Sequence, residues 1–104
     1  MEELGEREIS NVELVANLLH NSFEDANVSC CKCRLGGKKF IVEVKSMKMF
    51  LCVSHEYLSD QNKARISKDF EIQNVAGTLI ANPKQYFLLG NNGFQQIADQ
   101  DAAS

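Results

Sequence analysis

The stretch from Val28 to Val53, VSCCKCRLGGKKFIVEVKSMKMFLCV, decides how the chain folds. Tight two-residue hairpin turns require positive φ, which glycine adopts without steric cost, so Gly36-Gly37 predicts a hairpin. A second reversal near Ser46-Met47 adds a third strand that ends at Val53. We therefore expect this stretch to form a three-stranded antiparallel meander.

A tight turn at the two glycines sets the register of the first two strands. It places Cys33 opposite Phe40 and Cys30 opposite Glu43. Because side chains alternate between faces along a strand, one face of the meander is then apolar and the other polar. The expected apolar face carries Cys31, Cys33, Leu35, Phe40, Val42, Val44, Met49, Leu51 and Val53. The expected polar face carries Cys30, Lys32, Arg34, Lys39, Ile41, Glu43 and Lys45.

The segments on either side of the meander are expected to supply helices that cover its apolar face. Ser10 and Glu13 have the spacing of a capping box, which predicts a helix over residues 11–23. Ser59 is a suitable N-cap, which predicts a second helix over residues 60–70.

The C-terminal third is expected to add one strand and short helices. Residues 75–81 (VAGTLIA) are rich in strand-forming side chains, although Gly77 weakens that prediction. Asn82-Pro83 is typical of a helix start and Gly90 of a helix end, so residues 84–89 are expected to be helical. A further short helix is expected over residues 94–98.

These elements give the order α-β-β-β-α-β-α. The predicted fold class is α+β, with a small, mainly antiparallel sheet and helices on one face. The 104 residues are the length of one small domain, and residues 1–9 and 99–104 are expected to be frayed.

Composition and charge limit the classes of function. A net charge of −3 argues against a domain whose main role is to neutralise nucleic-acid backbone. No apolar run approaches the roughly 20 residues that a membrane span requires, and the acidic N-terminus differs from a signal peptide. We expect a cytoplasmic protein without a membrane partner.

The triplet Glu43-Val44-Lys45 is the first chemical feature in the meander. On a strand, residues two apart share a face, where a carboxylate and an ammonium can hold a divalent metal ion and orient a water molecule against a phosphodiester. The alternative interpretation is that both side chains belong to a solvated strand face. On the expected register, Cys30 rather than an acid stands opposite Glu43.

At these residues the chain resembles the PD-(D/E)xK nuclease superfamily, and within it the small VRR-type members. The resemblance includes the Gly-Gly turn before the strand, residues 58–61 at a helix start, and residues 78–83 before an apolar segment. It implies that Glu43 is a metal ligand, Lys45 a base and Gln61 an accessory catalytic residue.

The same resemblance implies a divalent cofactor, Mg²⁺ or Mn²⁺. Asp25 is the nearest acid upstream of the meander, and it becomes a second metal ligand if its loop folds back towards Glu43. A degenerate relative of such a nuclease would retain nucleic-acid binding without cleavage.

The four cysteines, Cys30, Cys31, Cys33 and Cys52, are expected to be free thiols, because disulfides are rare in the cytosol. Zinc sites require about four Cys or His ligands that converge, whereas the expected register divides these cysteines between two faces. A disulfide between Cys30 and Cys52 is disfavoured because they lie on non-adjacent strands.

The main hypothesis is a non-enzymatic protein-interaction module, such as an adaptor, an inhibitor or a chaperone-like protein, without a cofactor. Basic side chains on the meander can receive an acidic protein or a nucleic acid, and edge strands can support a homodimer. The candidate partner-binding residues are Lys32, Arg34, Lys39, Tyr86 and Phe87. The alternative is a metal-dependent nuclease or a degenerate, nuclease-like nucleic-acid-binding protein.

Overall fold

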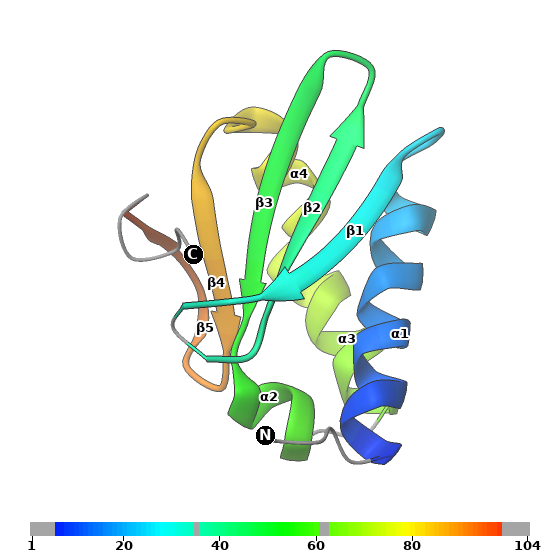
Figure 1. Cartoon of the computed structure of the whole chain (residues 1–104), viewed down its shortest axis with the longest axis vertical. Coiled ribbons are helices and arrows are strands. Elements are labelled where there is room, and N and C mark those ends of the chain that lie inside the picture. Colours follow the sequence, from blue (N-terminus) through cyan, green and yellow to red (C-terminus); the bar gives the residue numbers. More distant parts are fainter. Residues whose placement is uncertain (1–5, 35, 61–62, 99–104) are drawn as a thin grey trace.

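The computed structural model describes residues 6–34, 36–60 and 63–98, which fold into the helices and strands of Figure 1. In chain order the elements are α1 (Glu6–Ser22), β1 (Asn27–Lys32), β2 (Lys38–Val44), β3 (Met47–Val53), α2 (His55–Asp60), α3 (Lys63–Gln73), α4 (Val75–Ala81), β4 (Tyr86–Gly90) and β5 (Gly93–Ile97). The predicted α+β class is therefore confirmed, as are its N-terminal helix and its three-stranded meander.

The strands form one mixed sheet in which spatial order follows chain order, β1-β2-β3-β4-β5. Neighbouring strands are antiparallel except for β3 and β4, which are parallel. A parallel pair needs a long crossover connection, and here α2, α3 and α4 provide it. This crossover fixes β4 beside β3 and so determines which side chains meet there.

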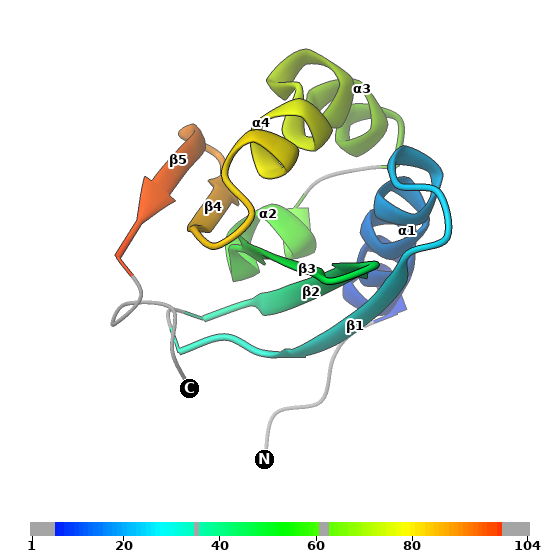
Figure 2. The same ribbon diagram turned by 90° about the horizontal axis from the view of Figure 1, so that it is seen from above.

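Helices α1, α3 and α4 lie on one side of strands β1–β3, as Figure 2 shows. Between these two layers lies the main hydrophobic core. Helix α1 contributes Val15 and Leu19, whose spacing of four residues places them on one helical face, and Phe23 follows directly after the helix. The meander contributes Phe40, Val42, Met49, Leu51 and Val53. In the described part of the chain, no helix combines the length and the apolar character that membrane spanning requires.

Helix α1 begins earlier than the capping box predicts. Ser10 lies inside the helix, because Glu6 and the following residues continue the helical pattern towards the N-terminus. The next residue, Asn11, is 1% exposed, and its Nδ2 donates a hydrogen bond to the carbonyl oxygen of Leu58. This buried bond ties α1 to α2.

The region of the helix predicted over residues 60–70 holds two helices, α2 and α3, and α3 confirms most of the predicted span. Ser54 rather than Ser59 caps the first of them, since its Oγ accepts a hydrogen bond of 3.2 Å from the Tyr57 backbone N–H. Helix α3 then begins at Lys63.

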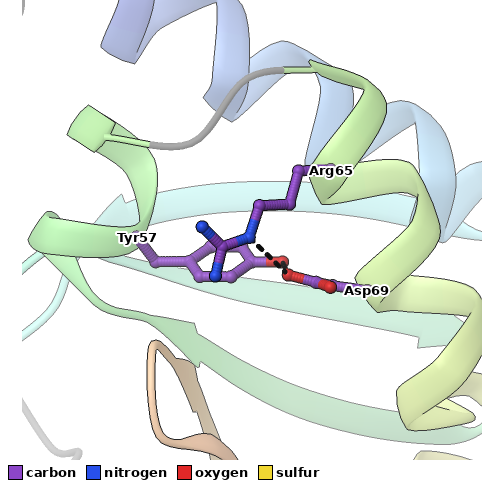
Figure 3. Close-up of polar contacts among 3 residues, drawn as sticks. All are labelled: Tyr57, Arg65 and Asp69. Carbon is purple, nitrogen blue, oxygen red and sulfur yellow. Dashed lines mark hydrogen bonds and ion pairs between the residues drawn. The ribbon is translucent and has the colours of Figure 1, made fainter.

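A side-chain cluster joins α2 to α3 (Figure 3). The hydroxyl of Tyr57 donates a hydrogen bond of 3.2 Å to Oδ2 of Asp69, and Arg65 Nε lies 3.7 Å from the same oxygen. Burial raises the pKa of Tyr57, and the negative charge of Asp69 raises it further. The tyrosine therefore stays protonated and continues to donate this bond at neutral pH.

The connection between β1 and β2 is longer than the predicted two-residue turn. The Gly36 N–H donates to the Cys33 carbonyl at 3.0 Å, and the Cys33 N–H donates to the Gly37 carbonyl at 3.3 Å. Both glycines have positive φ, 91° and 84°, as expected for a glycine turn. The longer loop shifts the register by three residues, so that Asn27 rather than Cys30 pairs with Glu43.

The odd shift exchanges the two faces of β1. Cys30 lies beside Phe40 on the helix side, and Cys31 lies beside Lys39 on the other side. The predicted faces of β1 are thus wrong, whereas those of β2 and β3 are confirmed by the burial of Phe40 and Leu51. The predicted place of Leu35 on the apolar face lies outside the described residues.

The segment predicted to be the last strand, residues 75–81, forms helix α4. Asn74 adopts the left-handed conformation (φ 52°) and separates α4 from α3. Val75 and Leu79, four residues apart, are buried on one side of α4. Packing of this helical face against the core therefore overrides the strand propensity of the segment.

The segment predicted to be the following helix forms strand β4 instead. Phe87 and Leu89 are buried and alternate with half-buried Tyr86 and Leu88, which is the two-residue period of a strand. The predicted helix over residues 94–98 is likewise wrong, because β5 occupies this segment and pairs with β4. Pairing with distant β3 decides the first outcome, and hairpin pairing with neighbouring β4 decides the second.

Candidate interaction surface on the helix-free face

The second face of the sheet, which we call the helix-free face because no helix of the described residues covers it, carries a row of apolar side chains. Ile41 pairs with Phe50, Phe50 with Tyr86, and Tyr86 with Ile97. Because these residues alternate with core residues along their strands, they lie on the face away from α1, α3 and α4. All four are partly exposed. We call these residues the apolar stripe.

The two aromatic residues of the apolar stripe are held in a fixed arrangement. The rings of Phe50 and Tyr86 stack with centroids 4.4 Å apart and planes 12° apart. The ammonium of Lys39 lies 5.9 Å from the centroid of the Tyr86 ring, within the range of a cation–π interaction. The stripe therefore presents an ordered aromatic surface rather than independent side chains.

A hollow of about 550 Å³ lies beside the middle of the apolar stripe, between the β2–β3 turn and the segment that leads into β4. These two segments lie at the same end of the sheet (Figure 1). The lining combines apolar side chains with two lysines, namely Met47, Phe50, Pro83, Tyr86, Lys48 and Lys84. The volume lies in the range of small-molecule and side-chain pockets, about 300–1,000 Å³.

Positive charge is concentrated in the segment that runs from the end of β1 to the start of β3. Residues 32–48 contain Lys32, Arg34, Lys38, Lys39, Lys45 and Lys48, but only one acid, Glu43. Lys84 adds a further cation at the hollow. Since the whole chain carries a net charge of −3, this segment is a local positive region on an acidic protein.

The structure separates the predicted partner-binding residues. Lys39 and Tyr86 meet on the helix-free face, whereas Lys32 ends β1 and Arg34 is exposed in the following loop. Phe87 faces the core at 4% exposure and stacks on Phe94, with ring centroids 5.0 Å apart. Phe87 therefore does not belong to this surface, because β4 is a strand and adjacent residues point to opposite faces.

The Glu-x-Lys triplet spans the end of β2 and the turn after it. Glu43 is exposed and pairs with Asn27 on one side and Lys48 on the other. Lys45 lies in the turn with φ of 56°, and Asp25 lies in the turn before β1 with φ of 58°. Both turn residues are exposed. The predicted role of Gln61 falls on a residue outside the described part of the chain.

The carboxylates of the described residues do not assemble a metal centre. Within residues 6–34, 36–60 and 63–98, no three His, Cys, Asp or Glu side chains are close enough to hold one ion together. A divalent ion normally requires several oxygen ligands, so Asp25 and Glu43 do not match the Mg²⁺ or Mn²⁺ site that the resemblance implies. The nuclease interpretation stays a hypothesis from sequence.

The positive φ of Lys45 leads to a first prediction. A side chain in the left-handed region costs about 1–2 kcal/mol relative to glycine, so Lys45→Gly should raise the free energy of unfolding by about 1 kcal/mol. Urea denaturation followed by circular dichroism measures this change. Lys48→Gly, within β3, is the control and should be destabilising. A loss of stability in Lys45→Gly would contradict the strain argument.

Two of the four free thiols form a small second core on the helix-free face. Cys33 and Cys52 are 2% and 0% exposed and contact the partly buried Tyr86, Leu88 and Ile97. The longer β1–β2 loop brings Cys33 onto Cys52, which corrects the prediction that they lie on opposite faces. Cys30 and Cys31 are exposed.

The buried pair should resist alkylation. Burial, followed by the hydrogen bond with Cys33, raises the pKa of Cys52 to about 12, so its reactive thiolate is scarce at pH 8. Iodoacetamide at pH 8 should label exposed Cys31 while Cys52 stays unmodified, as peptide mass spectrometry would show. Denaturation in guanidinium chloride should make all four cysteines reactive. Native labelling of Cys52 at the rate of Cys31 would contradict the burial of this pair.

Sequence reasoning did not identify the hollow. Phe50 could have been noticed, because its position in the alternating meander places a large aromatic side chain on the expected polar face. Pro83 and Lys84 gave no local signal, because they reach Met47 and Lys48 only through the parallel pairing of β3 with β4.

Comparison with known proteins gives no assignment. No family model, no curated protein and no solved structure matches the chain. The class that the fold itself defines is a small α+β domain with one helix-covered and one helix-free sheet face.

Proposed function

We propose that the protein is a non-enzymatic interaction module that binds an acidic segment of a partner protein on the helix-free face of its sheet. One observation carries this proposal: the aromatic centre of the apolar stripe borders a hollow with two lysines, on a chain that is acidic overall. We also propose that the protein acts in the cytoplasm, where its free cysteines stay reduced.

The distribution of polarity on this face supports the proposal. Protein interfaces commonly combine an apolar, aromatic centre with a charged rim. Here Phe50 and Tyr86 form the centre, and Lys48 and Lys84 lie beside them. Neither lysine has an ion-pair partner among the residues that the structure describes. Complementary charge on the partner would accelerate association and select acidic sequences.

Amide chemical-shift titration can test this function. The probe is a synthetic peptide of alternating glutamate and leucine residues, added to ¹⁵N-labelled protein. We expect shifts at the stripe residues Ile41, Phe50, Tyr86 and Ile97, together with weaker binding at high salt. The double variant Lys48→Glu/Lys84→Glu should lose most of the affinity, whereas Lys68→Glu, an exposed change on α3, should retain it.

Competing occupants give different results in the same experiment. A single-stranded oligonucleotide that shifts the stripe residues when the peptide does not would overturn the proposal in favour of nucleic acid. Shifts at the same residues that depend on protein concentration alone would indicate a homodimer, and this result would also overturn it.

A further inference from the structure

We infer that the hollow receives an aromatic side chain of the bound acidic segment, and that carboxylates beside that side chain meet Lys48 and Lys84. This inference rests on the proposed function and specifies the chemistry of its anchor. It assigns to the hollow a single occupant, an aromatic residue flanked by aspartate or glutamate.

The lining of the hollow favours an aromatic occupant. Phe50 and Tyr86 stack nearly parallel, so a third ring can continue the stack or contact a ring edge. Met47 lies at the same hollow, and its thioether makes favourable contacts with aromatic rings. Pro83 adds a further apolar wall. An aliphatic side chain would fill the space but would gain fewer of these contacts.

The two lysines favour carboxylates next to the ring. Lys48 lies on β3 and Lys84 lies in the segment before β4, and both are exposed at the hollow. Their long side chains can follow carboxylates at slightly different positions, because an ammonium acts as a flexible point charge. The site therefore accepts a short motif with an aromatic residue between acids.

The backbone that carries Lys84 and Tyr86 is held in place before binding. The Gln85 N–H donates to the Asn82 carbonyl at 3.1 Å, and the Asn82 N–H donates to the Thr78 carbonyl at 3.1 Å. These bonds join the end of α4 to the start of β4. A site that is already ordered loses less conformational entropy when the partner binds.

The net charge of the protein favours a peptide over nucleic acid. A nucleic-acid backbone carries a negative charge at each nucleotide, and it would meet the overall charge of −3 along its whole length. Glu43 stands directly beside Lys48 in the sheet but does not line the hollow, so it would repel a row of phosphates that extends beyond the hollow more than a carboxylate within it. A peptide needs negative charge only near Lys48 and Lys84.

The experiment compares three acidic peptides of equal length and charge, with phenylalanine, leucine or serine at the central position. Calorimetry should show that the phenylalanine peptide binds about fivefold more tightly than the leucine peptide. Nuclear Overhauser contacts should connect the peptide ring with the Met47 methyl group and the Phe50 ring.

Variants of the hollow separate the anchor from the general surface. Phe50→Leu keeps an apolar side chain and should reduce the preference for phenylalanine to near unity. Met47→Ala, at a side chain that is 37% exposed, tests the same wall without disturbing the core. Lys84→Glu should weaken all acidic peptides about fivefold, whereas Lys68→Glu should leave their affinities unchanged.

The outcomes distinguish this inference from the proposed function. Equal affinity for the three peptides, with shifts still centred on the apolar stripe, would overturn the aromatic anchor and leave the proposed function intact. If none of the three peptides binds and a single-stranded oligonucleotide does, both the inference and the proposed function are overturned. A phenylalanine preference that persists in both Phe50→Leu and Met47→Ala would place the anchor elsewhere and overturn the inference.

Discussion

Replacing Gly37 with alanine should leave little folded protein. A Cβ atom at this position would lie 2.0 Å from the Val53 carbonyl oxygen, 2.7 Å from the His55 nitrogen and 2.8 Å from the Ser54 carbonyl carbon. These contacts are with backbone and cannot be relieved by rotation of a side chain. The left-handed φ of 84° adds strain of its own. We expect the free energy of unfolding to fall by more than about 4 kcal/mol, which is close to the whole stability of a small domain.

Gly36→Ala is the matched control, because it lies in the same loop. Its φ is 91°, but an added Cβ would have no atom within 4 Å. Only the conformational strain should remain, and the cost should be about 1–2 kcal/mol. Urea denaturation of both variants, followed by circular dichroism, measures the difference. Equal losses in the two variants would show that the contact with the β3–α2 backbone does not matter.

Asn11→Asp is expected to have the next largest effect. The side chain is 1% exposed, and its Nδ2 donates to the Leu58 carbonyl oxygen. The substitution replaces this donor with a carboxylate oxygen that faces another acceptor in a site without water access. The free energy of unfolding should fall by about 3 kcal/mol at neutral pH.

The pH dependence of Asn11→Asp gives a second readout. Burial should raise the pKa of the introduced carboxyl above its unfolded value of about 3.9. A protonated carboxyl can donate to Leu58. Part of the stability should therefore be present below the unfolded pKa, and it should be lost as the pH rises through the higher pKa of the folded state. Asn17→Asp, an exposed change on the same helix, should be nearly neutral. A flat pH profile for Asn11→Asp would contradict a buried carboxyl at this position.

The parts of the fold that depend on local patterns could be predicted from sequence. The two glycines do adopt positive φ, and the alternation in β2 and β3 placed Phe40 and Leu51 in the core. The register of β1 could not be predicted, because turn length rather than composition decides it. The exchange of helix and strand after Asn74 arises from packing between residues far apart in sequence.

The residues of the candidate site divide in the same way, into those that local sequence indicates and those that only long-range contacts bring together. Lys39 and Tyr86 were identified from their residue types, and the structure places both on the helix-free face. Phe87 was misplaced because the segment was expected to be helical. Pro83 and Lys84 lacked any sequence signal, since their neighbours in the hollow come from another strand.

The parallel contact of β3 with β4 has a kinetic consequence. Phe50 and Tyr86 are 36 residues apart in sequence, so their stack forms only after the whole intervening chain has been closed into a loop. Contacts of such long range slow folding, whereas the β2–β3 hairpin closes locally. The proposed binding surface is therefore assembled late, and a partner that occupied it would select chains whose folding is complete. Such a partner would stabilise the finished fold by mass action.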